Sequence, residues 1–137
     1  MNRFAATALA FGASGFAGWA IENVLFGPRY SNAFRGHRVP FLPVYAVGGA
    51  SIALLSPVIV DLPWPARAGA YAAGLTALEL AACQLDRGAG PRTWDYGGAT
   101  PTGSCVDVPH AFAWGALGLA AESLIAELRS EGSEMGT

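Results

Sequence analysis

Two glutamates, Glu22 and Glu79, lie inside long apolar stretches of the sequence, where an ionisable side chain is unusual. A carboxylate at membrane depth costs about 2.5 kcal/mol or more unless it is paired or hydrated, so such residues mark functional sites by default. If apolar surroundings keep one of them protonated, it could act as a general acid, and Asp95 is a third candidate for such catalysis. The alternative is that Glu22 and Glu79 pair with Arg35 and Arg92 as structural locks.

A polar segment of roughly twenty residues, 86–108, separates the last two apolar stretches and contains Pro91-Arg92-Thr93-Trp94-Asp95-Tyr96. This length is unusual for a loop in a small protein and is typical of a functional loop. Its aromatic residues suit either an interfacial anchor or one wall of a site. We therefore predict a one-sided polar site without a metal or cofactor. The candidate ligand-binding residues are Trp19, Glu22, Arg35, Tyr45, Glu79, Arg92, Trp94, Asp95, Tyr96 and His110.

The composition is that of an integral membrane protein. Of the 137 residues, 53% are hydrophobic and only 13% are charged, and the mean hydropathy is +0.36. A net charge of −2 excludes a nucleic-acid partner, which would require a basic face. The expected partners are membrane lipids, a small-molecule, lipid or isoprenoid ligand, and a second copy or another membrane subunit.

The pattern predicts an all-α fold, a polytopic bundle of four transmembrane helices with a long polar loop between helices 3 and 4. The first apolar run exceeds the roughly 7–15 residues of a signal-peptide core, so we expect a retained span. A single domain would cover 1–129, and the composition of 130–137 indicates a disordered tail. The predicted spans are 4–26, 40–60, 65–85 and 109–128.

Small residues recur at every fourth position of the first span and line one face of the helix. Glu22 is the next position in this series, so its carboxylate should point into the bundle. On the last span, Trp114 and Glu122 share a face with His110. Pro43 and Pro57 could kink the second span, provided that neighbours satisfy the freed carbonyls. The small residues of the first span are Ala6, Ala10, Ser14 and Gly18.

The two cysteines, Cys83 and Cys105, indicate neither a disulfide framework nor metal-ligand spacing. We expect Cys83 to be a small packing residue within a helix. The role of Cys105 stays open.

Arginine counts favour one orientation in the cell membrane. Four spans would place the two long loops on one side and both termini on the other. Because cytoplasmic loops carry the excess of basic residues, the long loops are predicted to be cytoplasmic. The long-loop side holds Arg29, Arg35, Arg38, Arg87 and Arg92, against Arg3, Arg67 and Arg129 on the other side.

An ordered set of short motifs resembles the type IV ABC-transporter permease family, also called CmpB-like. The resemblance covers roughly residues 15–120 and implies a multi-span membrane fold, without implying a mechanism. No P-loop of the form GxxxxGK[ST] is present, so an ATP motor would come from another chain. Near the start of the last span, where the family has an apolar run into the proline, this chain has Asp107 and His110. The motifs are Gly18 to Asn23, Arg35-Gly36, Pro43 to Gly48, Leu78-Glu79, Trp94-Asp95-Tyr96, Gly103, Pro109 and Trp114-Gly115.

Three functions fit these features. The first is a transport component that binds a lipid or small molecule at the polar site. The second is a membrane enzyme acting on a lipid or isoprenoid, since the chain also resembles small membrane-bound carotenoid and terpene cyclases, with their Trp/Tyr loop before a Pro-led helix. The third is a structural subunit of a larger membrane complex.

Overall fold

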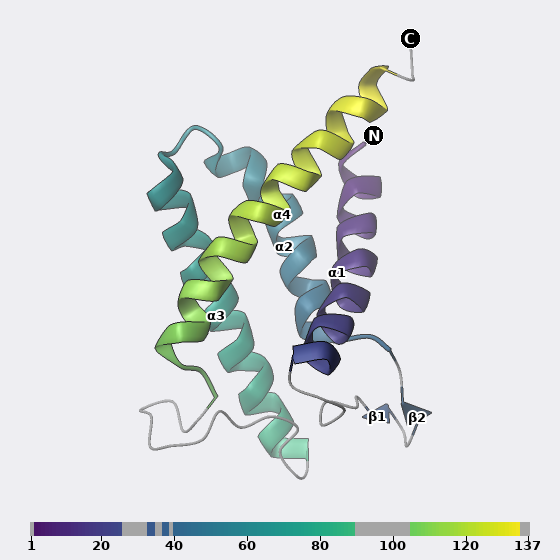
Figure 1. Ribbon diagram of the computed structural model, residues 1–137, viewed down its shortest axis with the longest axis vertical. Helices are drawn as coiled ribbons and strands as arrows, with labels where there is room; N and C mark the ends of the chain where they lie inside the picture. The colour runs from purple at the N-terminus through teal and green to yellow at the C-terminus, as the bar shows by residue number, and fades with distance from the viewer. Residues whose placement is uncertain (1, 26–32, 35–36, 39, 90–104, 135–137) are drawn as a thin grey trace.

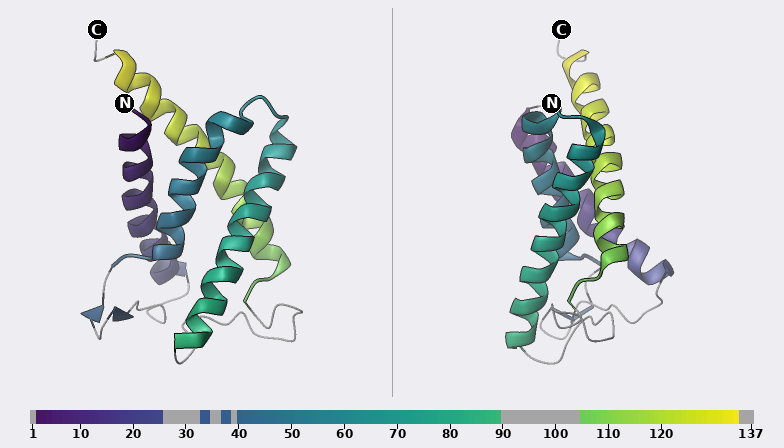
Figure 2. Two further views of the ribbon diagram at one scale, coloured as in Figure 1. Left: turned by 180° about the vertical axis from the view of Figure 1, so that it is seen from behind. Right: turned by 90° about the vertical axis from the view of Figure 1, so that its left-hand side faces the viewer.

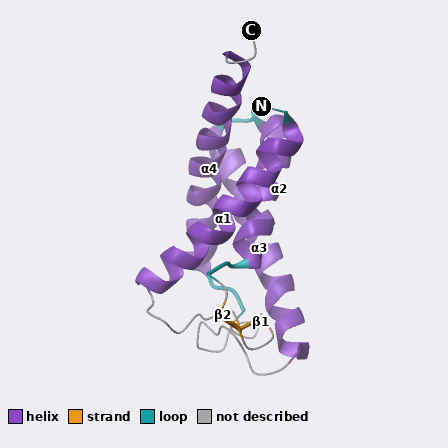
Figure 3. Ribbon diagram, turned by 90° about the vertical axis from the view of Figure 1, so that its right-hand side faces the viewer, coloured by secondary structure: helices purple, strands orange, loops and turns teal. Residues whose placement is uncertain are grey.

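The chain folds into four helices, as the computed structural model shows for residues 2–25, 33–34, 37–38, 40–89 and 105–134 (Figures 1 and 3). The all-α expectation is confirmed. A short antiparallel pair, β1 (Ala33–Phe34) and β2 (His37–Arg38), lies between the first two helices and was not predicted. Both termini lie at the end of the bundle that carries the α2–α3 turn, and β1 and β2 lie at the other end (Figure 1). The helices are α1 (Arg3–Leu25), α2 (Pro43–Ile59), α3 (Trp64–Ala89) and α4 (Val108–Glu134).

Local chemistry explains where the helices begin. The Asn2 side chain accepts a hydrogen bond from the Ala5 amide at 2.8 Å and caps α1. Helix α2 starts at Pro43, where the missing N–H is not needed, rather than at the expected residue 40. Asp107 caps α4 by accepting the His110 amide at 2.8 Å. At their far ends, α3 and α4 run past the expected residues 85 and 128.

Small residues bring the helices together in two pairs, α1 with α2 and α3 with α4. A methyl group on Gly18 would lie 2.2 Å from the Tyr45 ring, and one on Gly118 would lie 2.4 Å from Tyr71. Gly49 of α2 meets Ser14 in the same way. The small-residue face predicted for α1 therefore packs against α2.

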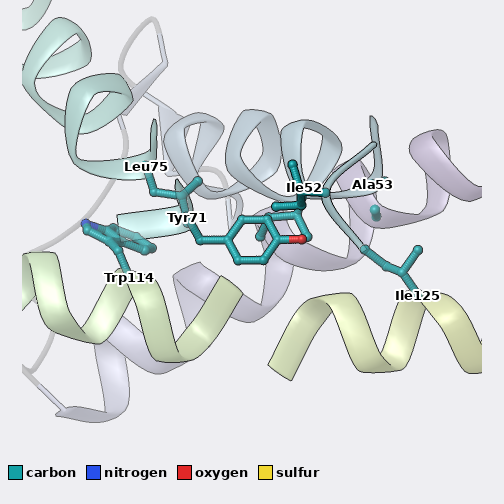
Figure 4. Packing of buried hydrophobic residues seen from close by; sticks show 8 residues of the cluster. Ile52, Ala53, Tyr71, Leu75, Trp114 and Ile125 are labelled. Carbon is teal, nitrogen blue, oxygen red and sulfur yellow. The ribbon is translucent and has the colours of Figure 1, made fainter. Parts of the chain in front are cut away.

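A buried core joins the two pairs, with Ala10 of α1 and larger side chains of α2, α3 and α4 (Figure 4). Tyr71 and Leu75 of α3 lie between Ile52 of α2 and Trp114 of α4, and Tyr71 is 2% exposed. The core is thin, because most large apolar side chains of the bundle point outward.

Pro57 lies inside α2 and cannot donate to the Ala53 carbonyl four residues earlier. Arg129 of α4 supplies the donor, with its Nη2 atom 2.7 Å from the Ala53 oxygen. A neighbouring helix thus satisfies the carbonyl that the proline frees, as we expected for prolines in this span.

The outer surface is apolar, which indicates a membrane protein. Helices α1 and α4 are long and apolar enough to cross a bilayer, and only 22% and 17% of their apolar stretches are buried. A core helix of a soluble protein would be mostly buried. Helix α2 is apolar but has 17 residues. Exposed side chains include Val24, Val58, Leu85 and Phe112, at 77–82%.

The structure overturns our expectation for the cysteines. Cys83 of α3 and Cys105, which precedes α4, form a disulfide with their Cα atoms 5.7 Å apart. Both residues are buried, at 2% and 0% exposure. Cys83 is therefore a cross-link and not only a packing residue, and Cys105 has a structural role. Their separation of 22 residues carries no signal of contact by itself.

Candidate functional site

Helices α1 and α2 hold the first embedded carboxyl group. Tyr45 of α2 donates a hydrogen bond from its hydroxyl to Glu22 Oε1 of α1 at 2.5 Å. Glycine at position 18, one turn before Glu22, leaves room for the tyrosine ring between the helices. The two predicted site residues therefore form one unit within the first helix pair.

Helices α3 and α4 hold the second carboxyl group in the same manner. Trp114 Nε1 of α4 donates to Glu79 Oε2 of α3 at 2.7 Å. Glu79 is 4% exposed and Trp114 is 9% exposed, so this hydrogen bond is buried. We did not predict Trp114 as a site residue, although its position one turn after His110 on the same face of α4 was a usable signal.

The aromatic rings of Tyr45 and Trp114 connect the two units. Their centroids lie 5.1 Å apart at an angle of 59°, a favourable geometry for an aromatic pair. The structure thus places Glu22 and Glu79 at the two outer ends of one chain of contacts that runs through all four helices. We call these four residues the aromatic–acid chain.

A cavity of about 240 Å³ lies beside this chain, between the two helix pairs. Its lining on α2 and α3 is buried or half-buried, whereas Ile21 of α1 and Leu117 and Leu124 of α4 are 40%, 44% and 62% exposed. The cavity therefore opens sideways between α1 and α4. It is lined by Ser14, Ala17, Gly18, Ile21, Val44, Tyr45, Gly48, Gly49, Ile52, Leu75, Leu78, Trp114, Leu117, Ala120, Ala121 and Leu124.

The aromatic–acid chain meets the cavity through its rings. Tyr45 and Trp114 line the cavity, while Glu22 and Glu79 lie behind them and are not in the lining. From Trp114 to Leu124 the lining extends over ten residues of α4, which is about 15 Å along the helix. The cavity is long, apolar along its length and aromatic at one end.

A third glutamate forms a separate cluster nearer the termini. Glu122 of α4 accepts a hydrogen bond from the Tyr71 hydroxyl at 2.8 Å and lies 3.4 Å from Arg67 Nε. Arg67 also donates to the Val60 carbonyl at the end of α2 at 2.8 Å. Here the carboxylate has a cationic partner, so this cluster is a structural lock of the kind we considered for the other two glutamates.

His110 belongs to the cap of α4 and is not in the cavity lining. Its ring Nδ1 lies 2.6 Å from Asp107 Oδ1, which also accepts its amide. Burial opposes ionisation of Asp107, but these hydrogen bonds outweigh it and hold the pKa of Asp107 below its ordinary value. These hydrogen bonds therefore stabilise the start of α4.

The other predicted site residues either do not line the cavity or lie outside the described part of the chain. Trp19 lies on α1, where its carbonyl accepts the Asn23 side chain at 2.8 Å, and it is not in the cavity lining. Among the described residues, no three His, Cys, Asp or Glu side chains gather closely enough to hold a metal ion. The remaining predicted residues lie outside the described part of the chain, and they are Arg35, Arg92, Trp94, Asp95 and Tyr96.

Comparison with known families adds a classification to this geometry. Neither a search of curated proteins nor a search of solved structures finds a match. A family model described as "Putative ABC-transporter type IV" matches residues 9–135, nearly the whole chain. The chain therefore belongs to this CmpB-like ABC-transporter family, as its motifs indicated.

Proposed function

We propose that this chain is the membrane-embedded, ligand-binding component of a transport system, and that it takes up the apolar part of an amphiphile between its two helix pairs. The cavity beside Tyr45 and Trp114 is the observation that carries this proposal. Membership of a transporter family supports the transport role.

The shape of the cavity favours a slender apolar ligand. Its volume of about 240 Å³ lies just below the range of roughly 300–1,000 Å³ that is usual for small-molecule pockets. Its opening lies among exposed apolar side chains of α1 and α4, so a ligand would enter from the bilayer rather than from water. Part of an acyl or isoprenoid chain fits both properties.

In this proposal all four helices cross the membrane, and α2 and α3 are the second and third spans in chain order. If transport consumes ATP, a partner subunit supplies the nucleotide-binding domain, because this sequence lacks a P-loop. The long-loop end and the aromatic–acid chain then lie on the same side of the membrane.

The geometry gives less support to the enzyme alternative. A glutamate that protonates a polyene must touch it, whereas Glu22 and Glu79 lie behind the two rings that line the cavity. A structural subunit would not need an open cavity between its helices. Of the three functions, binding therefore requires the fewest features beyond the cavity itself.

A cavity-filling variant tests the proposal. Ala120 lies in the cavity lining and Ala116, one turn earlier on α4, does not, although both are exposed. Ala120→Phe should abolish retention of co-purifying lipid or isoprenoid, measured by mass spectrometry of the purified protein, whereas Ala116→Phe should leave it unchanged. Equal retention by both variants would contradict the proposal.

A further inference from the structure

A second cavity, of about 200 Å³, adjoins the cavity of the proposed function. Its described lining comes from α2 and α3, whereas the first cavity also has lining residues on α1 and α4. Ser51, Leu55 and Gly74 line the second cavity and are exposed. The second cavity therefore opens between α2 and α3, and not between α1 and α4 as the first does.

Three apolar residues, Ile52, Leu75 and Leu78, line both cavities. A residue that borders two cavities separates them by no more than its own thickness. Ile52 and Leu75 are 5% and 6% exposed, and Leu78 is half-buried. We call these three residues the dividing wall, and it belongs to the buried core that joins the two helix pairs.

The two leucines of the dividing wall close the gap between α3 and α2 because α2 has a glycine opposite them. A methyl group added at Gly48 would lie 3.2 Å from Leu75 Cδ2 and 3.9 Å from Leu78 Cδ2. The leucine side chains of α3 therefore come close to the backbone of α2. Gly48 lines the first cavity, so this closure lies on the inner side of that cavity.

We propose that the dividing wall limits the width of the tail that the first cavity accepts, so that an unbranched chain fits and a methyl-branched chain does not. The inference rests on the proposed function, because it narrows the ligand class of the same cavity. Side chains of a packed core give way little to an added methyl group. One extra methylene group in a closed apolar pocket changes binding about tenfold or more.

Truncation of the wall should remove this limit. Leu75→Ala would join the two cavities, and the methyl branches of a ligand would then find room in the second one. Leu119 provides a matched control, because it packs against the same core and lines neither cavity. Leu119→Ala should loosen the core to a similar degree without joining the cavities.

Competition between two alcohols tests the inference. Hexadecanol is unbranched, and phytanol carries methyl branches on a main chain of the same length. The detergent-solubilised protein is incubated with equal concentrations of both, and native mass spectrometry measures the fraction that carries each. We expect the wild type and Leu119→Ala to carry about tenfold more hexadecanol than phytanol, and Leu75→Ala to carry similar amounts of the two.

Filling the second cavity should reverse the effect of Leu75→Ala. Gly74 lines the second cavity but not the first, and nothing lies within 4 Å of a methyl group added there. Adding Gly74→Leu to Leu75→Ala should therefore restore the preference for hexadecanol. Gly69 of the same helix is equally open and lines neither cavity, so Gly69→Leu should not restore it.

The outcomes separate this inference from the proposed function. Equal binding of the two alcohols by the wild type, or an unchanged ratio in Leu75→Ala, would overturn the role of the dividing wall and leave the amphiphile cavity intact. Binding of neither alcohol would overturn both. A preference that Gly69→Leu restores as well as Gly74→Leu would also overturn the inference. If Leu75→Ala fails to fold, Leu78→Ala decides the matter, because Leu78 borders both cavities and is only half-buried.

Discussion

Each of three embedded glutamates accepts a hydrogen bond from an aromatic side chain on the neighbouring helix of the same pair. The donors are Tyr45 for Glu22, Trp114 for Glu79 and Tyr71 for Glu122. A ring with one polar hydrogen satisfies a carboxyl oxygen while presenting apolar surface to its other neighbours. This pairing explains how a thin apolar bundle accommodates these polar groups among apolar side chains.

At the start of α4, the cap formed by Asp107 makes stability depend on pH. The folded pKa of Asp107 lies below its ordinary value, so its ionised form stabilises the native state. That contribution should be complete above about pH 4, the pKa expected in the unfolded chain, and should be lost as pH falls through the folded pKa. Asp107→Ala should cost about 1 kcal/mol at neutral pH.

Denaturant unfolding of the detergent-solubilised protein between pH 2 and pH 7 would measure this effect. The wild type and Asp107→Ala should differ most at neutral pH and converge at the acid end. Asp61, an exposed acid in the α2–α3 turn, provides the control, since Asp61→Ala should show no such convergence. A constant difference across the range would contradict the assignment.

The link between Pro57 and Arg129 is a property of two elements, α2 and α4. Arg129→Ala should leave the Ala53 carbonyl without the donor that replaces the missing proline N–H. Loss of a hydrogen bond from a charged donor costs about 1.5–3 kcal/mol. In a Pro57→Ala background, the alanine amide can bond to Ala53 within α2, so Arg129→Ala should cost much less.

A double-mutant cycle in mixed detergent micelles would measure this coupling. Pro57 is exposed, so its replacement by alanine removes little packing and does not obscure the result. The same penalty for Arg129→Ala in both backgrounds would show that Arg129 stabilises the bundle by another route.

Sequence patterns predicted the four helices but not the contacts between them. Long apolar runs locate helices, and the recurrence of small residues placed Glu22 on the face that packs against α2. Proximity of Cys83 to Cys105, or of Arg129 to Ala53, depends on how separate helices align, and no local period encodes it. Tyr45 and Glu79 were proposed as site residues, whereas Trp114, which contacts both, was missed although it shares a helix face with His110.

At the scale of the whole molecule, the two helix pairs are joined by a thin buried core and by a few polar and aromatic contacts. The hydrogen bonds to the glutamates stay within a pair, while the Tyr45–Trp114 ring contact and the Arg129–Ala53 hydrogen bond cross between pairs. The cavity is lined by residues of both pairs, whose helices Figure 2 shows from two further sides. Relative movement of the pairs would therefore change the cavity without breaking the hydrogen bonds to the three glutamates.

The Cys83–Cys105 disulfide indicates which end of the bundle faces the cytoplasm. It ties the end of α3 to the start of α4, at the end of the bundle opposite the termini. Structural disulfides persist in oxidising compartments and are rare in the cytosol. We therefore predict that the long-loop end faces away from the cytoplasm, opposite to the orientation that five arginines against three favoured.

Two measurements in a bacterial host decide between the orientation that the disulfide indicates and the one that the arginine counts favour. Cells quenched in acid and treated with a maleimide of high mass should show modification of the cysteines only after reduction, and a fluorescent protein fused to the C-terminus should fold in the cytoplasm. Cys83→Ser provides the control, because it frees Cys105 for labelling without reductant. If the wild type is labelled without reductant and the fused protein fails to fluoresce, the long loops are cytoplasmic. In that case the aromatic–acid chain would lie near the inner leaflet, and amphiphiles would enter the cavity from that side.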